Sequence, residues 1–153
     1  MMVMTAKVNL KKLSLLLGAL ILVVIALVTL LGHQSQTTGA AVSDNDARVS
    51  YLKSFGWEIS TAPVESGRVK IPSESSEVFD RYAQLQKTQG FDLSPYAGKT
   101  VMRYVYQITN YPNATEPVYA TLLVYKGQII GGDVTNTSAD GKVQGLAMPS
   151  PAE

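Results

Sequence analysis

Cysteine is absent from this 153-residue chain, and histidine occurs once, at His33. Without cysteine the protein can form no disulfide framework, thiolate nucleophile or thiolate metal site. With a single histidine, which lies ahead of the region that carries the aromatic residues, the chain also lacks multi-histidine metal sites and the Ser–His and Cys–His pairs of nucleophilic catalysis. The sequence therefore predicts a protein with no metal, no cofactor and no assignable catalytic residue.

Charge is also scarce. Only 16% of the residues are Asp, Glu, Lys or Arg, and the formal net charge is +1, whereas about a quarter of residues are charged in typical soluble domains. A net charge this small argues against bulk nucleic-acid binding. The mean hydropathy of +0.08 averages two unlike parts, an uncharged N-terminal stretch and a region of ordinary composition.

The uncharged stretch covers residues 13–32, of which sixteen are apolar. Twenty helical residues span about 30 Å, the thickness of the hydrocarbon core of a bilayer. Lys7, Lys11 and Lys12 precede the stretch, and no Lys or Arg follows it until Arg48. Because positively charged flanks stay in the cytoplasm, we expect a single-pass cell-membrane anchor with the N-terminus inside and the rest of the chain outside.

A cleaved signal peptide is the alternative, because small residues at Gly39, Ala40 and Ala41 offer a cleavage site. The apolar core is longer than the roughly 7–15 residues of such peptides, which favours the anchor. The anchor gives a domain organisation of five parts: a cytoplasmic N-terminus at 1–12, a transmembrane signal anchor at 13–32, a linker at 33–42, an extracytoplasmic domain at 43–147 and a flexible tail at 148–153. From residue 43 onward the chain carries ten basic and twelve acidic residues, a net charge of −2.

Helical periodicity predicts two helices in this extracytoplasmic part. The first begins at Ser43 or Asp44, which are good N-caps, and ends before Gly56, where glycine accepts a left-handed backbone. The second spans residues 74–89 with Ser73 as its N-cap. Its predicted buried face consists of four residues, Val78, Phe79, Tyr82 and Leu85.

Alternation of side chains predicts short strands, over residues 57–60, 68–71, 100–109, 118–125, 128–134 and 142–146. The dipeptide Lys126-Gly127 is typical of a two-residue hairpin turn, and strands joined by short turns pair antiparallel. We therefore expect an α+β fold in which two helices pack on one face of an antiparallel β-meander of about four strands.

Asp133 is the first candidate binding residue, because it follows Gly131 and Gly132 in a predicted strand. Two glycines in a strand let another backbone, a side chain or a ligand approach closely. A packing position under a helix explains the same pattern without a ligand. The glycine pair is not a dinucleotide fingerprint, since it neither follows a strand nor opens a helix.

Aromatic residues supply the second candidate. Tyr104, Tyr106, Tyr119 and Tyr125 are predicted to share one face of the sheet, with Arg103 beside them. Basic residues among exposed aromatics are typical of nucleic-acid stacking surfaces, but the acidic balance of this part argues against nucleic acid. Such a face would instead bind a peptide or a glycan, unless the tyrosines simply pack under the helices.

Several segments together resemble a known bacterial family, namely Tyr51–Trp57, Leu85–Leu93, Gly98-Lys99, Arg103–Tyr106, Asn110–Pro112 and Leu122–Asp133. The family is found mostly in spore-forming Gram-positive species and is catalogued only as a domain of unknown function. The resemblance covers roughly residues 45–146. It implies a membrane-anchored extracytoplasmic protein and supplies no activity. The hairpin that ends at Gly131–Val134 is also similar to small PepSY-type modules.

The sequence favours a non-catalytic binding or accessory module of the bacterial cell envelope, whose partner is an envelope protein, a peptide or a glycan and not a nucleic acid. One alternative is an envelope hydrolase that uses carboxylates. Glu77 and Asp80 share a helix face, but a glycosidase needs two carboxylates across a cleft. A structural component that self-associates is the other alternative.

Overall fold

The computed structural model describes residues 40–149, so the predicted cytoplasmic segment, the predicted anchor and residues 33–39 lie outside the described residues. The elements in chain order are α2 (Asn45–Lys53), β1 (Glu65–Lys70), α3 (Glu77–Thr88), the 3-10 turn η1 (Ser94–Tyr96), β2 (Thr100–Ile108), β3 (Val118–Tyr125), β4 (Gln128–Asn136) and β5 (Val143–Gln144). None of the helices between residues 40 and 149 is both long and apolar enough to cross a membrane. The predicted α+β class is confirmed.

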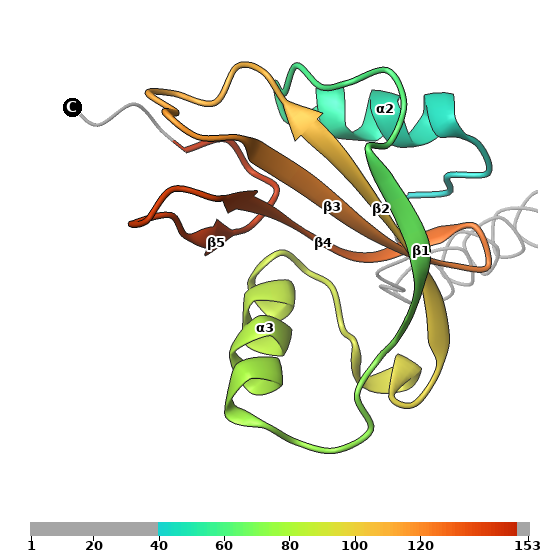
Figure 1. The fold of residues 1–153 in the computed structure, drawn as a ribbon. Helices are drawn as coiled ribbons and strands as arrows, with labels where there is room; N and C mark the ends of the chain where they lie inside the picture. Colours follow the sequence, from blue (N-terminus) through green and yellow to red (C-terminus); the bar gives the residue numbers. More distant parts are fainter. Residues whose placement is uncertain (1–39, 150–153) are drawn as a thin grey trace, which may run out of the picture. The chain divides into compact units, whose positions relative to one another are not determined.

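The five strands form one antiparallel sheet in the order β1-β2-β3-β4-β5. Figure 1 shows α2 on one face of this sheet and α3 on the other. The expectation that both helices cover one face is therefore wrong. The reason lies in the central strands, where both alternating sets of β2 and β3 contain buried apolar residues, the pattern of strands that are covered on two sides.

On the first face, α2 packs against the tyrosines of β2. The helix begins where predicted, because the Asp44 carboxylate accepts a hydrogen bond of 2.8 Å from the backbone N–H of Ala47. From the next turn, Arg48 donates through Nε to the hydroxyl of Tyr106 at 3.0 Å. Its guanidinium lies 3.8 Å from the centre of the Tyr104 ring. This cation–π contact lets a charged side chain be buried inside the layer.

Trp57 anchors the loop that follows α2. Its ring is buried and its indole Nε1 donates to the backbone oxygen of Leu146 at 2.7 Å. The ring of Tyr111 stacks on it, with 5.8 Å between the ring centres. The predicted strand at 57–60 is reduced to one bridge, between Ile59 and Ile108. The extended strand before α3 is β1 instead, which begins three residues before the predicted start at residue 68.

On the second face, α3 begins later than predicted. Its N-cap is Ser76, whose hydroxyl accepts from the N–H of Phe79 at 3.2 Å, and not Ser73. Because the segment before the helix is rich in serines that all suit an N-cap, the sequence alone did not select one. Phe79 and Tyr82 pack on the second core as expected, whereas Val78 is 81% exposed, so its predicted burial is wrong.

The second core beneath α3 is a smaller cluster than the first. Its buried members come from five parts of the chain, namely Ile71, Leu93, Val101, Leu123 and Ile130. The β3–β4 turn forms as predicted, with φ of 48° at Lys126 and 75° at Gly127. The last strand, β5, is only two residues long, shorter than the predicted strand at 142–146.

Different segments cover different parts of the outer edge of β4, and residues 41 and 42 lie at its start. Ala41 pairs with Gln128, and Val42 donates to the oxygen of Gly127 at 2.8 Å. Val42 is buried, so residues 41 and 42, which were assigned to the linker, pack against the domain. At the other boundary Met148, assigned to the tail, packs against the first core.

Candidate functional site

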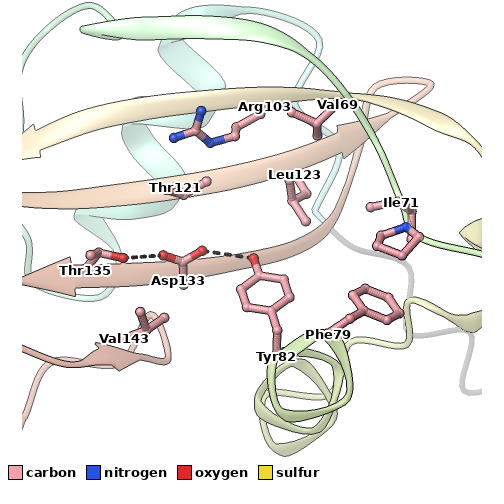
Figure 2. Close-up of a pocket in the computed structure, with 11 residues that line it drawn as sticks. Val69, Ile71, Phe79, Tyr82, Arg103, Thr121, Leu123, Asp133, Thr135 and Val143 are labelled. Atoms are coloured by element: carbon pink, nitrogen blue, oxygen red, sulfur yellow. Dashed lines mark hydrogen bonds between the residues drawn. The ribbon is translucent and has the colours of Figure 1, made fainter. Parts of the chain in front are cut away.

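A groove of about 410 Å³ lies between α3 and the second face of the sheet (Figure 2). Its apolar wall consists of Val69, Ile71, Pro72, Phe79, Leu123 and Val143. Its polar residues are Tyr82, Arg103, Thr121, Asp133 and Thr135. An apolar groove with a few convergent polar groups is the usual form of a binding site.

Asp133 is positioned by β4, with its side chain on the α3 side of the sheet. Its carboxylate accepts a hydrogen bond from the hydroxyl of Tyr82 at 2.9 Å and another from the hydroxyl of Thr135 at 2.9 Å (Figure 2). Only 6% of the residue is exposed. The predicted candidate therefore does line a groove, and its two oxygens already have partners within the protein.

Burial raises the pKa of the Asp133 carboxyl above its ordinary value, against the two hydrogen bonds and the charge of Arg103, which lower it. Burial, and then the nearby Asp133, also raise the pKa of the Tyr82 hydroxyl strongly. Tyr82 thus remains protonated and donates to Asp133 at any physiological pH. The Tyr82 hydroxyl therefore serves as a hydrogen-bond donor to the Asp133 carboxylate in the groove.

Arg103 lies on β2, two strands away from Asp133 in the sheet. It forms an ion pair of 2.6 Å with Glu65 on the neighbouring β1, and the arginine side chain is 36% exposed. Arg103 also borders a second cavity of about 440 Å³, which shares Thr121 and Thr135 with the first. We treat the two cavities as parts of one surface and name it the α3-face groove.

The glycine pair before Asp133 serves packing by the protein's own side chains. Gly132 exchanges two hydrogen bonds with the amide of Gln86, one of 3.0 Å from Nε2 and one of 2.9 Å to Oε1. A Cβ on Gly132 would lie 2.8 Å from the oxygen of Thr121, and a Cβ on Gly131 would lie 3.0 Å from Oε1 of Gln86. Of the interpretations that the sequence left open, the close approach of a side chain is the one the structure shows.

The predicted tyrosine face does not form. Pairing of Tyr106 with Ala120, and of Gln107 with Tyr119, puts Tyr104 and Tyr106 on the α2 side and Tyr119 on the opposite side. Tyr106 is fully buried, whereas Tyr119 borders the second cavity. The expectation of a shared face is wrong because Tyr104 and Tyr106 occupy the opposite set of alternating positions from Tyr119 once the strands are paired.

Three polar groove residues were missed by the sequence analysis: Tyr82, Thr121 and Thr135. Thr135 was detectable, because it follows Asp133 by two residues on the same strand and so shares its face. Thr121 pairs directly with Asp133, a register that only the strand pairing reveals. Tyr82 was predicted as an apolar core residue, and its hydroxyl contact crosses from another element.

The chemistry available in the groove is limited. Asp133 is the only carboxylate that lines the 410 Å³ cavity, and Glu65, which lines the adjoining one, is paired with Arg103. Among residues 40–149 there is no cluster of three or more His, Cys, Asp or Glu that could hold a metal ion. The groove can bind apolar groups and hydrogen-bond donors of a ligand. It does not place two carboxylates opposite each other across a cleft.

The fold and groove define a small α+β domain with a candidate binding groove on one sheet face. The chain belongs to the family described as Domain of unknown function (DUF4830), whose model matches residues 51–134, more than half of the chain. This confirms the predicted membership of a family with no assigned function. No curated protein and no solved structure matches the chain.

Proposed function

We propose that this protein is a non-catalytic binding module, anchored in the cell membrane by residues 13–32, that holds a partner of the cell envelope in the α3-face groove. One observation carries the binding role. The large apolar side chains that are most exposed in residues 40–149 are Val64, Val78 and Val143. Val64 and Val143 line the α3-face groove, and Val78 lines an adjoining cavity of about 320 Å³ that shares Tyr82 and Val143 with it. Exposed apolar groups that gather at one groove mark interaction sites.

The lining favours a peptide over a glycan as the bound partner. A glycan presents many hydroxyl groups and stacks on exposed aromatic rings, whereas the walls here are mainly aliphatic. An extended peptide would place apolar side chains against Val78 and Val143 and a carboxylate or carbonyl oxygen near Arg103. The binding energy would come mainly from the buried apolar area.

The alternatives are less well supported. A hydrolase that uses carboxylates needs a second acid facing Asp133, and the cavity supplies none within the described residues. Self-association through the valines is a separate outcome that an experiment can distinguish by the mass of the captured product.

Photocrosslinking in intact cells of the native host tests this proposal. A benzophenone amino acid replaces Val143 or Val78 in the full chain, and Ser50, exposed on α2, is the matched control position. We expect one discrete adduct with another protein from the groove positions, absent at Ser50 and weakened several-fold by Arg103→Ala. Equal adducts at all three positions, or none at the groove, would contradict the proposal, and an adduct of twice the chain mass would support self-association instead.

A further inference from the structure

The N-terminal end of the described domain is held against one end of the sheet. The oxygen of Ala40 accepts from the N–H of Ile129 at 3.2 Å, and Val42 donates to Gly127 at 2.8 Å. Both contacts are to the β3–β4 hairpin, so the chain joins the domain beside the Lys126-Gly127 turn. The position of residue 40 is thus fixed relative to the hairpin.

The distance from this hairpin to the membrane is limited by the chain itself. This step rests on the proposed anchor, which ends at Gly32, so that seven residues separate it from Ala40. Seven extended residues span at most about 25 Å. With this anchor, the hairpin end of the sheet can lie no farther than about this distance from the end of the predicted span.

Basic and aromatic side chains gather at this same end. Lys99 lies with its Nζ 5.5 Å from the ring centre of Tyr96 and 5.3 Å from that of Tyr125, and Lys126 lies 5.5 Å from the Tyr125 ring. The two rings meet edge to face, 5.4 Å apart. Both lysines are exposed and both tyrosines are half-buried. We call these four residues the lysine–tyrosine cluster.

Charged residues lie at both ends of the sheet, and a further lysine lies near the cluster. Lys70 ends β1 at the cluster end and pairs with Thr100, the first residue of β2. The opposite end carries the loop that contains Glu116, just before β3, and the turn that contains Asp140, just after β4. Lys70 thus adds a third lysine at the cluster end, where the exposed acids Glu74 and Asp92 also lie close in the chain, and Lys142 lies close to Asp140 at the far end.

We propose that the lysine–tyrosine cluster is a membrane-docking surface that contacts anionic lipid headgroups of the outer leaflet. Lysine is attracted to an anionic surface, and tyrosine is favoured at the headgroup level because its ring is apolar and its hydroxyl is polar. Together with the short tether, these contacts would hold the hairpin end of the sheet at the bilayer surface.

The experiment uses the full chain in two kinds of nanodisc, one of phosphatidylcholine alone and one of equal phosphatidylcholine and phosphatidylglycerol. Exposed lysines are acetylated with a water-soluble reagent and quantified by mass spectrometry. We expect labelling of Lys99 and Lys126 to slow about fivefold in the anionic discs. Labelling of Lys87 on α3 and Lys142 before β5, both exposed, should be unchanged.

Each outcome separates this inference from the proposed function. If the chain enters the nanodiscs but all four lysines are labelled equally in both lipids, the docking surface is wrong and the anchor stands. If the chain does not enter the discs, the anchor is wrong and the docking surface falls with it. Slower labelling of Lys87 and Lys142 as well would indicate general adsorption, which also overturns the proposal.

Discussion

At the scale of single residues, Asp133 shows how burial and hydrogen bonding oppose each other. Two hydroxyl donors favour its ionised form, while removal from water favours the neutral acid, and burial is the larger effect on the pKa. Asp92 behaves in the opposite way. It is exposed, and a hydrogen bond of 2.9 Å from the backbone of Ser94 lowers its pKa. Location therefore decides what a carboxylate contributes to this fold.

The raised pKa of Asp133 predicts a pH-dependent loss of stability. Because the folded state binds this proton more tightly than the unfolded state, the free energy of unfolding decreases as the pH rises from the ordinary pKa of 3.8 to the raised folded value. Asp133→Asn should remove this pH dependence. The free energy of unfolding of the variant should therefore rise relative to that of the wild type as the pH increases across this range. Urea unfolding at several pH values measures the difference, and parallel curves for the two proteins would contradict the expectation.

The two glycines Gly132 and Gly67 offer a matched pair for the packing of the sheet. A methyl group on Gly132 would lie 2.8 Å from the oxygen of Thr121 and 2.9 Å from Leu146, whereas one on Gly67 meets nothing within 4 Å. We predict that Gly132→Ala lowers the free energy of unfolding by about 1–3 kcal/mol through overpacking. Gly67→Ala should change it by less than about 0.5 kcal/mol.

Chemical denaturation followed by the fluorescence of the buried Trp57 reports this comparison, since the chain contains one tryptophan. Equal effects of the two substitutions would show that Thr121 and Leu146 relax freely. That result would contradict the close packing described for β4.

At the scale of elements, α3 is joined to β4 by the side chain of Gln86, which forms hydrogen bonds of the kind that a neighbouring strand would form. The amide of Gln86 both donates to and accepts from the backbone of Gly132, at a point that β5 does not reach, since β5 pairs only with Val134 and Thr135. Gln89 adds a second donor to the same oxygen at 2.9 Å and accepts from Leu146. This arrangement covers an edge that would otherwise be open to another chain.

We predict that Gln86→Leu destabilises the domain by about 1–3 kcal/mol, because the buried N–H of Gly132 then loses its acceptor. Gln84→Leu, at an exposed position on the same helix, is the control and should have little effect. Amide hydrogen exchange gives a specific measurement, since protection of the Gly132 amide should fall in the first variant. Unchanged protection would contradict the role of Gln86.

At the scale of the whole molecule, the described domain consists of two cores on the opposite faces of one sheet. The first is larger and includes Val42 from the segment that leads out of the N-terminal region. This contact makes Val42 part of the packed domain. The packing of Val42 at the N-terminal end of the domain therefore contributes to the stability of the domain.

Val42→Ala in the full chain should lower the free energy of unfolding by about 2 kcal/mol, from lost apolar burial and the remaining cavity. Val64→Ala is the control, because Val64 is 53% exposed and its truncation should cost less than about 0.5 kcal/mol. Thermal unfolding in detergent compares the two. Equal midpoints for both variants would place residue 42 outside the cooperative unit.

Local signals determined much of the described fold. The Asp44 cap, the alternation in β2 and β3 and the Lys126-Gly127 turn each depend on a few neighbouring residues, so the sequence by itself determined them and the α+β class. Asp133 was found in the same way, from a carboxylate next to two glycines in a strand. The absence of cysteine, and of histidine beyond His33, likewise excluded thiol and histidine chemistry without reference to any structure.

Only the tertiary structure decided which face each helix covers, that Tyr104 and Tyr106 lie away from Tyr119, and that Tyr82 and Thr121 meet Asp133. These features depend on strand register and on contacts between residues far apart in the chain. A shift of one residue in register exchanges the two faces of a strand, and β2 and β3 are apolar enough on both faces to permit either side. Side-chain packing on the whole sheet, not local preference, resolved that choice.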